Sequence, residues 1–237
     1  MAITHVDTNF ARVTVNGDIT VTAPTGIADD DLLMAYYLHT DNNAEPVSCT
    51  GFTTIEAGVE DGLGGIDSTT AFFRKIASSE AGNYTMSGDS PPTPLTSNGV
   101  VGCFRGVDTT TPMDVTYVQG DHYSKHDNAA SVTNDPITTV TDGAWVLLYI
   151  WIGQGNVTDF TAPSGYTIAV KNAGQTSSNV ALAYKEVATA GTETPGPWTA
   201  TGISTTEEVV TVTLAIRPAS TTSIAAIMRH RQMLGMS

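Results

Sequence analysis

The stretch DDDLLMAYYL at residues 29–38 returns 113 residues later as DGAWVLLYIW at residues 142–151. Each copy leads from a turn into an apolar run of the kind that forms a buried β-strand. The repetition indicates that the chain contains two related units, so the remaining sequence is compared half against half.

Other segments repeat at nearly the same spacing. The matched pairs are Thr50–Phe52 with Ser164–Tyr166, Phe73–Ala77 with Tyr184–Ala188, Tyr84 with Trp198, and 99–105 with 209–216. A nearly constant offset with small slips is typical of a duplicated unit with loop insertions, here at approximately 23–115 and 136–218. Because a strand must bury its apolar face against another layer, we expect the two halves to form one domain.

The composition favours strands and turns. Only 14% of the 237 residues are charged, and Gly, Thr and Ser are abundant. We therefore expect an all-β protein, an antiparallel, jelly-roll-like β-sandwich over residues 1–218. An Asn16-Gly17-Asp18 turn between alternating apolar residues predicts a hairpin over 11–22, and the span 39–68 is predicted to be rich in turns.

The formal net charge of −14 and the pI near 4.4 argue against nucleic-acid binding, which needs a cationic face for phosphates. The longest apolar run, Ala144–Ile152, is far shorter than the ~20 residues that span a bilayer. The N-terminus shows neither the basic nor the apolar region of a signal peptide. We expect a soluble protein made in the cytoplasm, without nucleic-acid or membrane partners.

Two cysteines, Cys49 and Cys103, are interpreted as free thiols of a protein folded in a reducing compartment, with a disulfide as the alternative. Cys103 lies in an apolar run and is expected to point into the core. Cys49 is expected in a loop.

Two constellations raise the question of a metal. His122 and His126 have i, i+4 spacing and could share Zn²⁺ on a helix, but the surrounding residues favour a polar loop between the repeats. The run Asp29-Asp30-Asp31 could collect Ca²⁺, but it lacks an EF-hand pattern and is interpreted as a solvated turn before a strand. We expect no metal and no other cofactor.

Candidates for catalysis are weak. The carboxylate pair of a glycosidase could come from Glu56, Glu60, Asp61 and Asp67. We interpret these residues instead as an acidic surface loop. The chain has no Gly-Xaa-Ser-Xaa-Gly elbow, P-loop or zinc-spaced cysteine pair. We therefore expect that the protein is not an enzyme.

Aromatic residues could stack on sugars if they were exposed. Most of them match between the repeats and fall within strand patterns, which favours core packing instead. The set comprises Tyr36, Tyr37, Phe72, Phe73, Tyr149, Trp151, Tyr184 and Trp198.

The C-terminal tail 219–237 differs from the rest of the chain, since no acidic residue follows Glu208. Its apolar residues have helical spacing and Ser/Thr capping candidates precede them, which predicts a short helix. Such a helix is too short to be stable alone. We expect the tail to dock on a partner, the alternative being a disordered end. The expected docking residues are Ile224, Ile227, Met228, Arg229, Arg231 and Leu234.

Four phrases carry a family resemblance: APTGIADDDLL at 23–33, FRGVDTTTPMD at 104–114, APSGY at 162–166 and VTLAIRP at 212–218. They resemble a structural domain that is widespread in tailed-phage virion proteins, and the resemblance covers roughly residues 20–218. It implies a β-sandwich with a structural role in the virion, and it brings no catalytic residues.

From these observations we expect a capsid decoration or cement protein on the head exterior. Its partners would be the major capsid protein or other virion proteins, and it would form a homo-oligomer such as a trimer. The alternatives are a tail-fibre or baseplate component, a carbohydrate-binding module that contacts the host surface, and a hydrolase of surface polysaccharide.

Overall fold

The computed structural model describes residues 1–14, 18–40, 47–60, 68–88, 96–115, 123–127, 131–154, 157–175, 177–202 and 208–220. Within these ranges the protein is all β: the strands pair in antiparallel fashion and no helix occurs. The prediction of an all-β antiparallel protein is therefore confirmed. The tail from 221 onward, with its predicted docking residues, lies outside the described residues.

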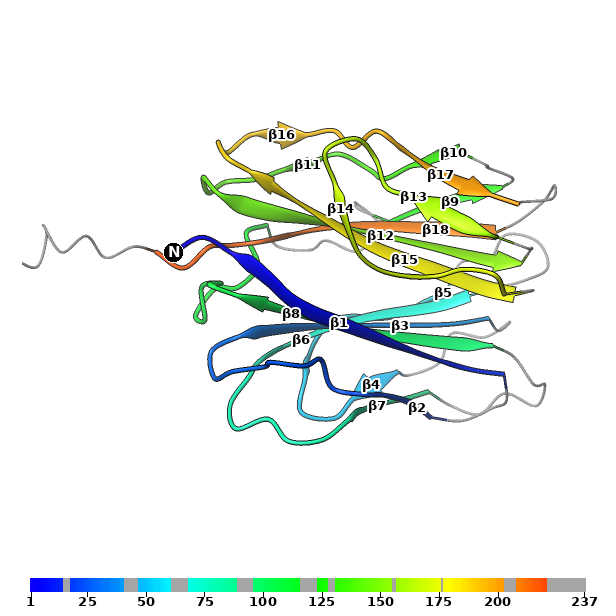
Figure 1. Ribbon diagram of the computed structural model, residues 1–237, viewed down its shortest axis with the longest axis horizontal. Helices are drawn as coiled ribbons and strands as arrows, with labels where there is room; N and C mark the ends of the chain where they lie inside the picture. Colours follow the sequence, from blue (N-terminus) through cyan, green and yellow to red (C-terminus); the bar gives the residue numbers. More distant parts are fainter. Residues whose placement is uncertain are drawn as a thin grey trace, which may run out of the picture.

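Two five-stranded sheets form the centre of the molecule (Figure 1). The first runs in the order β1 (Thr4–Val13), β8 (Ser97–Arg105), β3 (Leu32–Thr40), β6 (Ser68–Ile76) and β5 (Thr53–Glu60). The second runs in the order β9 (Tyr123–Asp127), β18 (Glu208–Ile216), β12 (Ala144–Gln154), β15 (Ser177–Val187) and β14 (Thr167–Asn172).

Smaller sheets lie on the outer side of each large one (Figure 1). One consists of β2 (Ile19–Val21), β7 (Tyr84–Ser87) and β4 (Ser48–Cys49), and the other of β10 (Ser131–Thr133), β17 (Pro197–Thr201) and β13 (Asp159–Thr161). A two-stranded pair, β11 (Ile137–Thr138) with β16 (Thr192–Glu193), accompanies the second. In each large sheet, the edge strand (β1 or β9) is the first of the five strands along the chain, and the strand beside it (β8 or β18) is the last of the five.

The central strands bury both of their faces. On β3, Leu32, Met34, Tyr36 and Leu38 contribute to the core between the two large sheets, whereas the alternate residues contribute to a separate core under the first small sheet. On β12 the same alternation divides residues between the central core and a core under the second small sheet. Since side chains alternate along a strand, burial of both faces explains why these stretches are continuously apolar.

Three local expectations are wrong. The predicted hairpin over 11–22 is not formed, because β1 pairs with β8 while β2 pairs with β7 in a different sheet. The predicted loop at 121–127 contains β9 (Tyr123–Asp127), an edge strand paired with β18. The predicted turn-rich span 39–68 contains β4 and β5.

Candidate functional site

The N-terminus, the last described residues and the segment between the halves meet at one end of the molecule. We call this region the junction (Met1–Ala2, 105–114 and 217–220). The Met1 amino group donates to the Ala219 carbonyl at 2.8 Å, and Ala219 N donates to the Gly106 carbonyl at 2.8 Å. An isolated β-bridge joins Val107 to Pro218. The chain leaving β8 and the chain leaving β18 are therefore held side by side.

Gly106 is required by this arrangement. Its φ of +81° lies in the region that favours glycine, and an added Cβ would lie 2.4 Å from the Ala2 carbonyl oxygen. The close approach of two backbones at this point leaves no room for a side chain.

An ion pair between an exposed arginine and a buried carboxylate closes the first half at the junction. Arg105, the last residue of β8, donates from Nε and Nη2 to the two carboxylate oxygens of Asp31 at 2.9 and 2.8 Å. Asp31 also accepts a bond from Ala28 N at 2.9 Å and is only 1% exposed. Burial would raise the Asp31 pKa, but these bonds outweigh it and the pKa is lowered. The prediction of a solvated turn is thus wrong for Asp31, although Asp29 and Asp30 are exposed.

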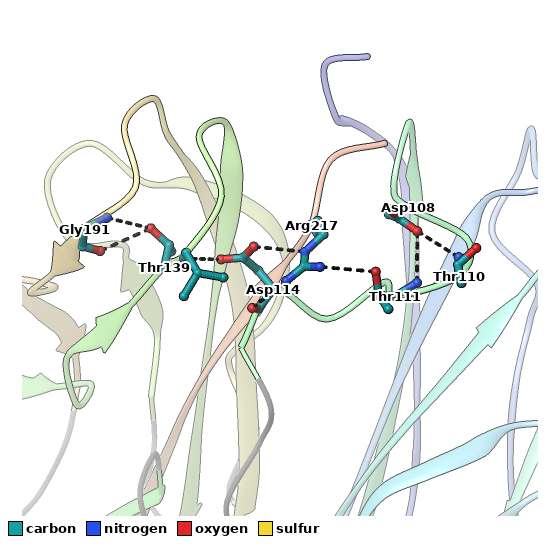
Figure 2. Close-up of polar contacts among 8 residues, drawn as sticks. Asp108, Thr110, Thr111, Asp114, Thr139, Gly191 and Arg217 are labelled. Carbon is teal, nitrogen blue, oxygen red and sulfur yellow. Dashed lines mark hydrogen bonds and ion pairs between the residues drawn. The ribbon is translucent and has the colours of Figure 1, made fainter. Parts of the chain in front are cut away.

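The second half uses an arginine at the same place but takes its carboxylate from elsewhere (Figure 2). Arg217 follows β18 directly, and its Nε lies 3.3 Å from Oδ1 of buried Asp114. Asp114 belongs to the segment that joins the halves, and its Oδ2 accepts a bond from Val140 N at 2.7 Å. This ion pair therefore ties the connecting segment to both the end of β18 and the approach to β12.

The connecting segment is stiffened by its own hydrogen bonds (Figure 2). Oδ1 of Asp108 accepts bonds from the backbone nitrogens of Thr110 and Thr111, each at 2.9 Å. These bonds lower the Asp108 pKa. Thr111 also accepts a bond from Arg217 Nη1 at 3.3 Å, and Thr139 exchanges backbone and side-chain bonds with Gly191. The polar groups drawn in Figure 2 thus bind one another.

A second arrangement occurs once in each half. Lys75 Nζ lies 5.8 Å from the centre of the Phe52 ring and 2.8 Å from Glu80, while Tyr84 donates to Glu80 at 3.1 Å. Burial would raise the Glu80 pKa, but the bond from Lys75 and the other bonds lower it.

In the second half the same types of group recur. Lys185 Nζ lies 5.4 Å from the centre of the Tyr166 ring and 2.8 Å from Glu193, and Tyr166 itself donates to Glu193 at 3.1 Å. Gly51 and Gly165, with φ of +80° and +84°, precede the two aromatic residues. The repeats in the sequence pair the two turns and the two strand ends, but they contain no signal for the lysine–glutamate pairs.

Two hollows flank the last described residues of the chain. One of about 500 Å³ is lined by Asp29, Asp30 and Arg105 among others, and one of about 580 Å³ by Asp142, Glu186 and Arg217 among others. Met1, Asp108, Ala219 and Ser220 line both. The arginines are engaged with Asp31 and Asp114, and the Met1 amino group adds one positive charge. The exposed carboxylates outnumber it and leave this surface acidic.

The structure describes only some of the predicted metal and catalytic candidates. His126 lies on β9, and His122 is outside the described residues. Glu56 and Glu60 lie on β5, and Asp61 and Asp67 are outside. No group of three or more His, Cys, Asp or Glu in the described part of the chain could hold a metal ion.

The cysteines are both buried and unpaired, so the prediction of free thiols is confirmed and the disulfide is not formed. Burial raises the pKa of each thiol to about 12. Cys103 points into the core as predicted, whereas Cys49, predicted in a loop, lies on β4.

The aromatic set is used for packing, as predicted. Seven of its members are buried: Tyr36, Tyr37, Phe72, Phe73, Tyr149, Trp151 and Trp198. The eighth, Tyr184, is partly buried and stacks on Trp145 with ring centres 4.7 Å apart.

Comparisons with models of known protein families, with curated proteins and with solved structures each found no match. Across the described ranges, no helix is long and apolar enough to cross a membrane.

Proposed function

We propose that this protein is a structural subunit of a tailed-phage virion, a decoration or cement protein on the exterior of the head. In this proposal the chain is a duplicated β-sandwich whose halves pack through their large sheets. The proposal assigns it no catalytic activity and no cofactor. Its partners would be the major capsid protein or other virion proteins, with further copies of the chain in a homo-oligomer.

The observation that carries the proposal is the location of the four phrases that resemble the phage domain. They supply Asp31, Arg105, Asp114 and Arg217, the two ion pairs of the junction, together with the turn that holds Tyr166 against Lys185. Their polar groups join segments that are distant in the chain. Such a use supports a structural role for these phrases rather than a chemical one.

The correspondence of strand orders supports the duplication. If the strands of each large sheet are ranked by their order along the chain, both sheets have the spatial order first, fifth, second, fourth, third, read from β1 or from β9. The two three-stranded sheets likewise share the order first, third, second. Each half has its own core beneath its small sheet in addition to the shared central core. A compact unit of this kind suits a subunit that must remain folded on the outside of a particle.

The carbohydrate-binding alternative needs exposed aromatic side chains that can stack on sugars. The aromatic residues considered for that purpose are buried, apart from Tyr184, whose ring lies on Trp145. No feature of the described residues favours the tail-fibre or baseplate alternative.

The test is to measure the copy number in purified particles of the phage that encodes the protein. Quantitative mass spectrometry, with the major capsid protein as internal standard, should find a number comparable with that of the capsid protein. A handful of copies would favour the tail or baseplate instead. Absence from particles that are otherwise complete would refute a virion role.

A further inference from the structure

The surface formed by the two hollows, which we call the exit surface, is the place where the chain leaves the described fold. We propose that the exit surface binds the C-terminal segment 221–237 of a second copy of this chain. The inference rests on the proposed structural role, because it names the contact by which copies of the subunit would join.

Charge complementarity is the first argument. Exposed carboxylates of Asp29, Asp30, Asp142 and Glu186 surround the two hollows. The two arginines in the linings do not neutralise them, since each is bound to its own buried aspartate. The segment 221–237 carries Arg229, His230 and Arg231 and no acid, in a chain whose net charge is −14. An acidic surface and a cationic segment attract each other and define the orientation of docking.

Exposed apolar side chains are the second argument. Met1, which lines both hollows, is 68% exposed, and Val140, next to the lining residue Thr141, is 64% exposed. The segment offers Ile224, Ile227, Met228 and Leu234. Burial of these residues against the apolar side chains of the exit surface would add to the electrostatic attraction.

The symmetry of a pair favours a second copy over the segment's own exit surface. Ala219 is held on both sides, by Gly106 through its nitrogen and by Met1 through its carbonyl, and Ser220 lines both hollows. The last described residue of the chain therefore lies beside both hollows. In a symmetric pair each segment crosses to the other copy, and both contacts form together.

The experiment uses the full chain and reverses charge on each side of the contact. One variant carries Arg229→Glu with Arg231→Glu, and the other carries Asp29→Lys with Glu186→Lys. Sedimentation velocity should show that the unmodified protein associates and that high salt weakens this association. In each variant alone, the apparent dissociation constant should rise about tenfold or more. Asp18→Lys, an exposed carboxylate at the start of β2, serves as the matched control and should associate normally.

Mixing the two variants is the decisive step. Each reversed segment then meets a reversed surface and each original segment meets an original surface, so the mixture should associate although neither variant does so alone. Failure of the mixture to associate, or unchanged association in either single variant, would overturn the inference. A full chain that remains monomeric at all concentrations would do the same.

Melting curves show whether each variant is folded. Ser79 N donates a hydrogen bond to Asp29, so if Asp29→Lys disturbs the fold, the single variant Glu186→Lys replaces the double variant. A negative result here leaves the virion role intact, because presence in particles is measured separately. Absence from particles together with charge-swapped association would refute only the virion role.

Discussion

The rings of Tyr36 and Tyr149 stack on each other across the two large sheets, with centres 5.2 Å apart and planes inclined by 12°. The two residues are 113 positions apart, the spacing of the repeated stretches in the sequence. Both side chains are buried, and neither hydroxyl has a hydrogen-bond partner among the described residues. Burial raises the pKa of both phenols far above the ordinary value. The centre of the molecule thus combines strong packing with two unpaired polar atoms.

Replacing Tyr36 or Tyr149 by Phe is therefore expected to be neutral or stabilising, by up to about 1–2 kcal/mol. The substitution keeps the ring contacts and removes a buried hydroxyl that makes no bond. Urea unfolding of each variant measures the change. Tyr84→Phe is the matched control, since its hydroxyl donates to Glu80, and it should lose about 0.5–1.5 kcal/mol. A clear loss of stability in Tyr36→Phe would contradict the assignment of an unpaired hydroxyl.

The second prediction concerns the ion pair of the connecting segment. Arg217→Ala removes the cation that faces buried Asp114, and the free energy of unfolding should fall by about 2–3 kcal/mol. The comparison is Lys171→Ala, which removes the cation of an exposed pair with Asp159 and should leave stability almost unchanged. Equal effects of the two substitutions in chemical denaturation would show that Asp114 does not depend on Arg217.

The third prediction concerns the two halves. Residues 1–115 and 116–220, expressed separately, should not give monomers with a sharp thermal transition. Each half would expose its side of the central core, including Tyr36 on one side and Tyr149 on the other. Calorimetry with light scattering tests this. A half that melts cooperatively as a monomer would mean that the chain consists of two independent domains.

The strongest elements of the fold could be predicted from the sequence because their burial is complete. β3 and β12 are apolar on both faces, so both strands could be predicted from the sequence. Edge strands are different. β9 reads YSKHD and carries charges of the kind that edge strands use, so it resembles a loop. β5 pairs with β6 through two irregularities in register, which weakens its alternation.

The junction could be predicted only in part. The sequence matches the runs 99–105 and 209–216. The carboxylates that bind Arg105 and Arg217 nevertheless come from different places: Asp31 precedes β3, whereas Asp114 lies between the halves. Pairing of residues that lie more than a hundred positions apart depends on the tertiary path of the chain. Spacing in the sequence therefore gave no sign that Asp114 and Arg217 would meet.

The last prediction concerns pH and the contact between the halves at His5. The His5 ring, on β1, lies 5.0 Å from the Tyr184 ring of the second half and 5.7 Å from the Phe104 ring. Its Nε2 lies 2.8 Å from Thr8 Oγ1. Burial lowers the His5 pKa, and nearby Asp7 opposes that effect only in part.

Because the folded pKa is below that of an unfolded histidine, about 6.5, the unfolded state binds more protons as the solution is acidified. The contribution of His5 to stability is therefore complete above about pH 6.5 and decreases as the pH falls from there through the folded pKa. Carboxylates with lowered pKa, such as Asp31 and Glu80, act in the same direction but only at lower pH, around and below their unfolded values near 4. The chain has five histidines, so denaturant unfolding between pH 7.5 and 5 isolates the share of His5 only by comparison with a His5 variant. His5→Gln should flatten the curve in this interval, and the same slope in the variant and the unmodified protein would rule out His5 as its source.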